Sequence, residues 1–156
     1  MIDQFKKALN YSFLLLKYRL RTVKEIKDRL KKKRFEDSII EKVIDYLREH
    51  NYINDREFAY AFTKEKLERG FGIRRVLSDL RRLGIHHSLV EEILQRAERE
   101  FNQQEVLRKL IDKLYKRYKD KKRKREKIMR YLLQRGFSYD EILRYLEKDE
   151  NRLIEE

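Results

Sequence analysis

The sequence predicts an all-α fold of three tandem three-helix repeats, and its composition and the spacing of its apolar residues support this. Apolar residues make up 40% of the chain and charged residues 44%, a ratio that suits helices burying only one stripe each. The chain has no proline and only four glycines. It also lacks alternating apolar runs bounded by turn residues, so we do not expect a β-rich fold.

A set of eight apolar positions in the first third of the chain recurs twice. The first copy comprises Ile26, Leu30, Phe35, Ile39, Ile40, Val43, Ile44 and Leu47. A shift of 50 residues places an apolar residue at all eight positions, and a further shift of 52 keeps six, with Glu141 and Asp149 as the exceptions. Spacings of three and four within each copy predict two helices joined by a short turn, a helix-turn-helix-like pair.

An amphipathic segment precedes each helix pair and completes a three-helix repeat. These segments run from Phe5 to Leu20, from Phe58 to Leu67 and from Leu107 to Tyr118. The predicted repeats therefore occupy residues 1–50, 51–100 and 101–148, and an acidic tail follows at 149–156. Repeats that each bury one thin core and touch only their neighbours form a short solenoid.

Residues that cap helix N-termini stand where three of the predicted helices begin. Thr22, Asn54 and Ser138 are each followed three residues later by a glutamate. This is the spacing of a capping box, in which a side-chain oxygen and a carboxylate each accept a hydrogen bond from a backbone N–H. These residues therefore predict three helix starts.

The segment ERGFGIRRVLSDLRRLGI, from Glu68 to Ile85, contains three of the four glycines. Gly72 takes the position of Thr22 in the second repeat and predicts a helix N-cap. Gly70, Gly84 and Gly136 each stand before a large apolar residue, the pattern of a left-handed helix stop. A phosphate-binding loop would need a preceding strand and either a third glycine or a Gly-Lys-Ser/Thr ending. Because these are missing, we expect the glycines to delimit helices.

The net charge of +13 and the sequence pI of about 9.8 favour a polyanionic partner such as nucleic acid. Residues 101–135 hold 14 Lys and Arg against 4 Asp and Glu. No stretch approaches the roughly 20 apolar residues that span a bilayer, and the basic run is too polar for a membrane-surface helix. We therefore expect a cytoplasmic protein with no membrane partner.

The sequence offers no candidate for catalysis or metal binding. With no cysteine, a disulfide framework and a thiolate zinc site are excluded. The only histidines are His50, His86 and His87, and an adjacent pair in a turn lacks the further ligands of a metal cage. No Ser/His/Asp constellation or carboxylate pair can be argued from the pattern. We expect a monomer that is not an enzyme and carries no cofactor or metal.

Two groups of basic residues are candidates for contact with a nucleoprotein partner. The first lies on the helix predicted around Val76 and Leu80 and comprises Arg74, Arg75, Arg81 and Arg82. The second lies in KDKKRKREK, residues 119–127, and comprises Lys121, Lys122, Arg123, Lys124 and Arg125. Either group can instead be a solvated helix surface, which is common for charge runs. Guanidinium groups suit bidentate contacts to phosphate or carboxylate, and phosphate contacts make binding fall steeply with salt.

The segment from Asn51 to Leu94 resembles the signature of the RecX family of bacterial recombinase regulators. The matching features are an aromatic and an apolar residue before an acidic turn (Tyr52, Ile53, Asp55), an aromatic-alanine pair (Phe58, Ala59), a Gly-Phe-Gly break at 70–72 and a Gly-Ile helix end at 84–85. The opening segment, Ala8 to Leu30, is similar to the family's N-terminal module, and the resemblance covers about residues 5–147. Arg34, where the other repeats have glycine, departs from the pattern and predicts a less sharply specified turn. The acidic tail has no counterpart in the pattern.

This resemblance implies an elongated, curved arrangement of the three repeats. It also implies binding to RecA and its filament on single-stranded DNA, with inhibition of ATP hydrolysis and strand exchange through blocked filament extension or disassembly. Recombination and DNA repair would be modulated accordingly. Two alternatives stay open: a helix-turn-helix DNA-binding protein and an α-solenoid adaptor whose charge only keeps it soluble. The predicted third helices begin EDSII, HHSLV and SYDEI, whereas base-reading helices carry Asn, Gln or Arg in that turn.

Overall fold

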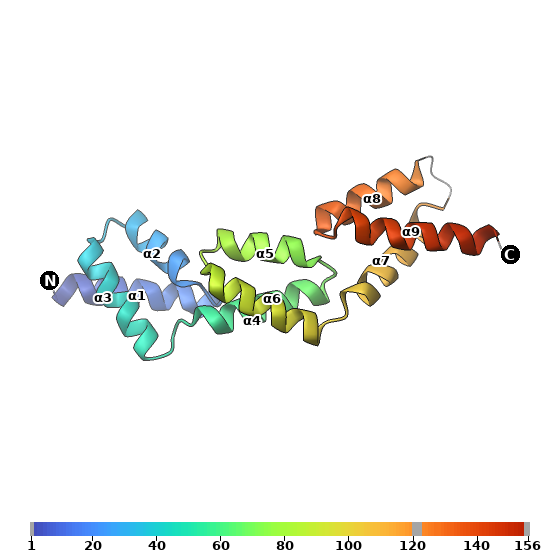
Figure 1. Ribbon diagram of the computed structural model, residues 1–156. Helices are drawn as coiled ribbons and strands as arrows, with labels where there is room; N and C mark the ends of the chain where they lie inside the picture. Colours follow the sequence, from blue (N-terminus) through green and yellow to red (C-terminus); the bar gives the residue numbers. More distant parts are fainter. Residues whose placement is uncertain (1, 120–122, 155–156) are drawn as a thin grey trace. The chain divides into compact units, whose positions relative to one another are not determined.

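The computed structural model describes residues 2–119 and 123–154, with side chains described up to Lys148. These residues form α-helices and no strand, which confirms the predicted all-α fold (Figure 1). The helices are α1 (Ile2–Tyr18), α2 (Val23–Lys32), α3 (Asp37–Glu49), α4 (Asp55–Glu68), α5 (Ile73–Arg82), α6 (His87–Glu100), α7 (Gln103–Arg117), α8 (Lys124–Arg135) and α9 (Tyr139–Ile154). None of them is both long enough and apolar enough to cross a membrane, within the part of the chain that is described.

The chain divides into two compact units. The first unit holds the residues up to Phe62 together with Leu80–Glu91, and the second holds Thr63–Asp79 together with the residues from Glu92 onward. The divisions fall inside α4, α5 and α6, so the middle repeat contributes residues to both units. The repeat boundaries at 50, 100 and 148 and the curved arrangement of the repeats stay predictions.

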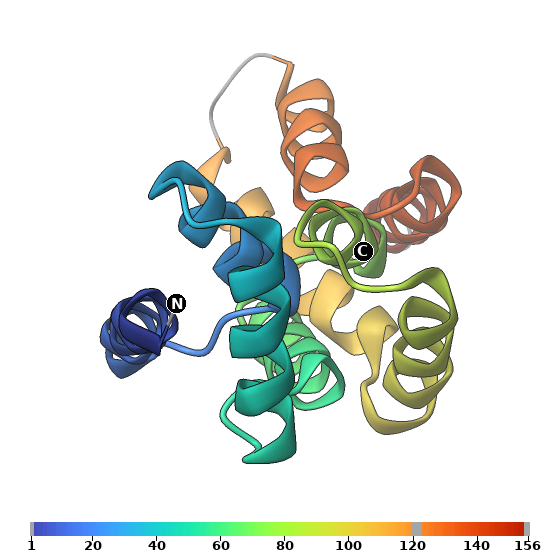
Figure 2. The same ribbon diagram turned by 90° about the vertical axis from the view of Figure 1, so that its left-hand side faces the viewer.

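The core of the first unit lies among α1, α2 and α3. Every one of the eight apolar positions of the first repeat is buried except Phe35, which is half-buried against the same core. Ala8 and Leu15 of α1 complete this core. Figure 2 looks along α1 and shows α3 running across the view, so these two packed helices cross at a steep angle.

The core of the second unit includes a cluster among α7, α8 and α9. Its buried residues are Leu107, Ile111, Leu114, Ile128, Leu132, Phe137, Ile142 and Leu146. Glu141, the polar exception in the third repeat, is half-buried at the start of α9. In the middle repeat, Leu89 and Leu94 are half-buried and the other six predicted positions are buried.

The predicted helix starts are confirmed by their hydrogen bonds. Glu25 N donates to Thr22 Oγ1 at 3.2 Å, and Thr22 N donates to Glu25 Oε2 at 2.9 Å. Ser138 and Glu141 form the same reciprocal pair, at 3.2 and 2.9 Å. At the start of α4, Glu57 N donates to Asn54 Oδ1 at 3.2 Å.

The helix stops also follow the prediction, with one difference at Arg34. Gly70, Gly84 and Gly136 have φ angles of 82°, 84° and 97°. Arg34 adopts the same left-handed conformation, with φ 63°, so the first turn is not less sharply specified. Phe35 N donates to Leu30 O at 3.2 Å and the Phe35 ring packs on the core, and these two interactions hold Arg34 in a conformation that favours glycine.

Candidate functional site

In the second unit, the C-terminal end of α8 docks on the N-terminal end of α5. Gly72 N donates to Arg135 O at 2.7 Å, and Arg75 Nη1 donates to Gln134 O at 3.2 Å. A Cβ atom at Gly72 would overlap the carbonyl group of Gly136. Glycine is therefore required at position 72 because two backbone segments meet there.

This contact decides what the Gly-Phe-Gly break does. Gly72 O accepts a hydrogen bond from Val76 N at 3.3 Å, which confirms Gly72 as the N-cap residue directly before α5. The Gly72 N–H is bonded to the α8 carbonyl and does not face an open phosphate cradle. The negative end of the α8 dipole thus meets the positive end of the α5 dipole, which stabilises the contact.

Four cationic side chains surround the ring of Phe71, between the two glycines. Arg135 Cζ lies 4.3 Å from the ring centre, Lys66 Nζ 4.9 Å, Arg69 Cζ 5.7 Å and Arg75 Cζ 5.9 Å. These distances are in the range of cation–π interactions. Lys66 lies on α4, Arg69 directly follows α4, Arg75 lies on α5 and Arg135 ends α8. All of them belong to the second unit. We call Phe71 with these four side chains the Phe71 cluster.

Two carboxylates partly balance the Phe71 cluster. Asp79, whose side chain is only 9% exposed, lies 3.5 Å from Arg75 Nε. Glu65 lies 3.5 Å from Arg69 Nη1, and both side chains are more than half exposed, so this pair contributes little stability. No carboxylate forms an ion pair with Arg135 in the described ranges. Arg135 therefore keeps a positive charge that no described carboxylate neutralises by an ion pair.

The four predicted arginines of α5 belong to two different compact units. Arg74 and Arg75 are exposed and belong to the second unit, whereas Arg81 and Arg82 are exposed in the last turn of α5 and belong to the first. Of these four, only Arg75 joins the Phe71 cluster. The other cationic members, Lys66, Arg69 and Arg135, could not be predicted, because the only signal in the sequence was an aromatic residue flanked by glycines.

The second predicted group lies around the start of α8. Lys121 and Lys122 lie outside the described residues. Arg123 caps α8 with φ 56° and is exposed, with its Nε 3.9 Å from Glu126. Lys124 Nζ lies 4.3 Å from the centre of the Tyr115 ring, and Arg125 is exposed. Arg123 and Arg125 are therefore exposed, whereas Lys124 is half-buried against Tyr115, and their role in binding an anionic partner stays a prediction.

The first unit contains a joint of the same kind, between the end of α5 and the start of α2. Thr22 Oγ1 donates to Leu83 O at 2.7 Å, and a Cβ atom at Gly84 would overlap the side chain of Lys24. The repeat shifts map Thr22 onto Gly72 and Gly84 onto Gly136. The two joints are therefore equivalent, although a side chain makes the hydrogen bond in one and the backbone in the other.

The Glu25 carboxyl, which caps α2 beside this joint, has a lowered pKa. Burial raises the pKa of Glu25, but hydrogen bonds from the Arg19 guanidinium and from Thr22 N outweigh burial, so the pKa lies below the ordinary glutamate value. The charged form of Glu25 is thus the one that caps α2.

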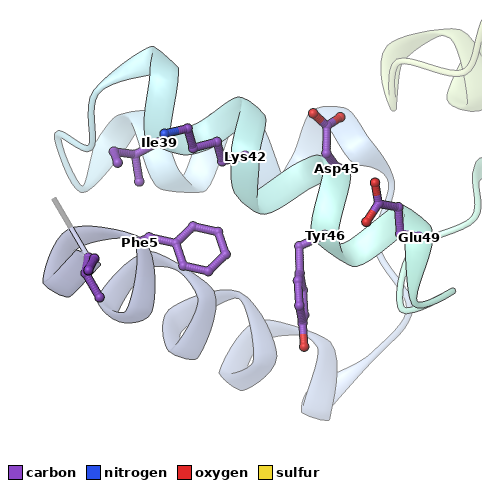
Figure 3. A pocket seen from close by; sticks show the side chains of 7 residues that line it. Phe5, Ile39, Lys42, Asp45, Tyr46 and Glu49 are labelled. Carbon is purple, nitrogen blue, oxygen red and sulfur yellow. The ribbon is translucent and has the colours of Figure 1, made fainter.

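A groove lies between α1 and α3 in the first unit. Figure 3 shows the rings of Phe5 and Tyr46 in this space, with their centres 6.2 Å apart. Lys42, Asp45 and Glu49 also line the groove, which encloses about 600 Å³. The described residues that line the groove include the Tyr46 hydroxyl but no histidine, serine, threonine or cysteine, so they do not form a nucleophile–histidine pair of the kind typical of catalysis.

His86 lies at the start of α6, whereas His50 lies at the C-terminal end of α3. His86 Nδ1 accepts a hydrogen bond from Ser88 N at 3.3 Å, as expected for a turn residue that caps α6. Within residues 2–119 and 123–148, no group of three or more His, Cys, Asp or Glu side chains is placed to hold a metal ion.

Comparisons with known proteins point to one family. Residues 8–47 match the model of the first three-helix domain of RecX, and residues 102–146 match that of the third. The regulatory protein RecX of Bacillus velezensis is 36% identical over 151 residues, which cover 95% of this chain and 57% of that protein. The corresponding protein of Caldanaerobacter subterraneus is 29% identical, over 88% of this chain and 68% of that protein. The chain spans about half to two thirds of the length of these curated relatives.

Solved structures show the same similarity. The crystal structure of RecX from Lactobacillus salivarius superimposes with a TM-score of 0.79 at 28% identity, covering 95% of this chain and 97% of that one. A second crystal structure, of a regulatory protein RecX, gives a TM-score of 0.76 at 26% identity over 94% of this chain and 73% of that one. The fold described above is therefore the fold of these proteins.

Proposed function

The chain belongs to the RecX family of regulatory proteins, and on this premise we propose that it binds RecA and the filament that RecA forms on single-stranded DNA. Bound there, it inhibits ATP hydrolysis and strand exchange, either by blocking filament extension or by promoting disassembly. The protein acts as a monomer in the cytoplasm and modulates recombination and DNA repair. The proposal is carried by the similarity to RecX along nearly the whole chain.

The cationic surfaces support this proposal in chemical terms. A RecA filament on DNA combines nucleic-acid phosphates with protein carboxylates, and both are partners for guanidinium groups. Arg74 and Arg81 are exposed on α5, and Arg123 and Arg125 are exposed around the start of α8. These side chains contact the filament without chemical change to it, so the protein regulates by occupancy.

The alternative of a sequence-specific DNA-binding protein has less support. The third helices of the repeats begin at Asp37, His87 and Tyr139, and none of them starts with the Arg, Asn or Gln that reads base edges. A defined footprint on duplex DNA, with no effect on RecA, would favour this alternative over the proposal.

The test is the ATPase activity of RecA on single-stranded DNA, measured with this protein at a substoichiometric ratio. We expect strong inhibition. Adding the protein before or after filament assembly separates the two modes, because a block of extension acts on growing filaments and disassembly also acts on finished ones. Unchanged ATPase activity in both orders of addition would refute the proposal.

A pair of charge variants tests the α5 arginines. Arg74→Gln with Arg81→Gln removes two exposed charges from α5, and Arg108→Gln with Arg130→Gln removes two exposed charges elsewhere. We expect the α5 pair to raise the concentration needed for half-inhibition about tenfold, which corresponds to about 1.4 kcal/mol. The control pair should have a much smaller effect. Equal effects of the two pairs would show that only net charge matters.

A further inference from the structure

We propose that the Phe71 cluster is a binding site for the phosphate groups of a nucleic-acid strand, and that binding there tightens the joint between α5 and α8. This goes beyond the proposed function, because it names the side chains that contact a nucleic-acid strand and couples that contact to the joint between α5 and α8. It also assigns binding to side chains outside the two predicted basic groups, namely Lys66, Arg69 and Arg135.

The charges around Phe71 call for an anion. Four cations lie between 4.3 and 5.9 Å from the centre of one ring. They therefore share one small region, in which like charges repel one another. Asp79 and Glu65 offset the charges of Arg75 and Arg69. Arg135 forms no ion pair with a carboxylate of the described ranges, so an anion bound beside its guanidinium offsets a charge that these residues leave unbalanced.

Arg135 is held in place before any ligand arrives. Its guanidinium lies over the Phe71 ring, and its Nε donates to the Tyr131 hydroxyl at 3.1 Å. A side chain fixed in this way loses little conformational freedom on binding. Its Nη nitrogens form the fork that matches two phosphate oxygens.

The arrangement fits a phosphate strand better than a single carboxylate. The cations come from α4 and the turn after it, from α5 and from α8, so a ligand with several negative charges can contact more of them than a single carboxylate can. A nucleic-acid strand carries a charge on every nucleotide and gains further from counterion release. Arg69 and Arg75 have side chains that are 58% and 47% exposed, so a strand can reach them.

The same residues form the joint between α5 and α8. Gly72 N donates to Arg135 O, and Arg75 Nη1 donates to Gln134 O. A phosphate that contacts the side chains of Arg75 and Arg135 therefore bridges the two helices whose backbones already meet. Bridging disfavours opening of the joint, so exchange of the Gly72 amide hydrogen slows when the strand is bound.

The experiment uses the full chain and a fluorescently labelled oligothymidylate, followed by anisotropy at several salt concentrations. We expect Arg135→Gln to weaken binding about fivefold and to reduce the salt dependence by about 0.7 in log–log slope, the value for one lost contact to a single strand. Arg69→Gln, which lies away from the joint, should act in the same direction. Arg130→Gln is the matched control on α8, because Arg130 is exposed and lies outside the cluster.

Hydrogen exchange at Gly72 provides the second measurement. We expect the oligonucleotide to slow this exchange in the unmodified protein and to have less effect in the Arg69→Gln variant. A labelled duplex of the same length, measured in parallel, shows whether the cluster binds the phosphates of single strands or those of duplex DNA. Preference for either supports a phosphate site.

Three results would overturn the proposal. One is that Arg135→Gln and Arg69→Gln bind with the same affinity and salt slope as Arg130→Gln. Another is that exchange at Gly72 is unchanged by the oligonucleotide. The third is equal loss of binding to poly-glutamate, which would make the cluster a general anion site. RecA ATPase activity is measured with the same proteins to keep the two proposals apart. If Arg135→Gln does not change DNA binding but the unmodified protein still inhibits RecA, the phosphate site is refuted and the proposed function is not.

Discussion

Replacing Gly72 by alanine tests whether the joint between α5 and α8 stabilises the second unit. Gly72 does not have a positive φ angle, so alanine introduces no left-handed strain. Its Cβ would overlap the carbonyl group of Gly136 and lie 2.6 Å from Phe137 N. Because these are backbone atoms, the end of α8 has to move away from α5.

The size of the effect follows from three contributions. Forcing a methyl group into packed atoms costs about 1–3 kcal/mol. Displacing α8 also weakens the hydrogen bond from Gly72 N to Arg135 O, at 2.7 Å, which contributes about 0.5–1.5 kcal/mol. Alanine reduces the entropy of the unfolded chain and returns about 0.4–1 kcal/mol. The net loss of unfolding free energy is about 2 kcal/mol, which lowers Tm by about 4–8 °C in a chain of this size.

Urea unfolding followed by far-UV circular dichroism measures this change. Ser78→Ala is the matched control, because Ser78 is exposed on the same helix and should change stability by less than about 0.5 kcal/mol. Hydrogen exchange at Val76, whose amide bonds to Gly72 O, shows whether the start of α5 is loosened. If Gly72→Ala were as stable as Ser78→Ala, the close approach of the two backbones would not contribute to folding.

Three further predictions concern a helix stop, a capping glutamate and the start of α8. Arg34→Gly should stabilise the protein by about 1 kcal/mol, because Arg34 has φ 63° and a left-handed conformation costs about 1–2 kcal/mol in other residues; an unchanged or lower Tm would contradict this. Glu25 has a lowered pKa, so its contribution is present above the unfolded glutamate value of about 4.3 and is lost as pH falls through the lowered pKa. Glu25→Gln should flatten this acidic part of a stability–pH curve, and an identical curve would show that the pKa of Glu25 does not differ between the folded and unfolded states. Arg123→Gln with Arg125→Gln should reduce the salt dependence of binding to RecA filaments on DNA, and a flat salt response in the unmodified protein would remove phosphate contacts from this region.

Helix positions could be predicted because their signals are local. Apolar residues at spacings of three and four placed the helices, and Thr22 and Ser138 marked two helix starts that the structure confirms. These effects act within one or two turns of chain, so neighbouring residues contain the information. The conformation of Arg34 could not be predicted in this way, because packing of Phe35 on the core among α1, α2 and α3 overrides the preference of the residue itself.

The candidate site was only partly predictable. The sequence marked Arg75 as one of a dense arginine group, but it contained no signal that Arg135, 60 residues further on, lies over Phe71. Periodicity predicts which side of a helix is buried, whereas it does not predict which exposed side chains of separate helices meet. That depends on how the helices approach one another.

By itself, the sequence determined the all-α class, the recurring apolar pattern, the helix starts and stops and the excess of positive charge. Only the tertiary structure decided that Gly72 is a point of contact with the end of α8 and that four cations gather around Phe71. The physical reason is range: capping and periodicity act between neighbours in the chain, whereas backbone contact and charge clustering need segments that only packing brings together.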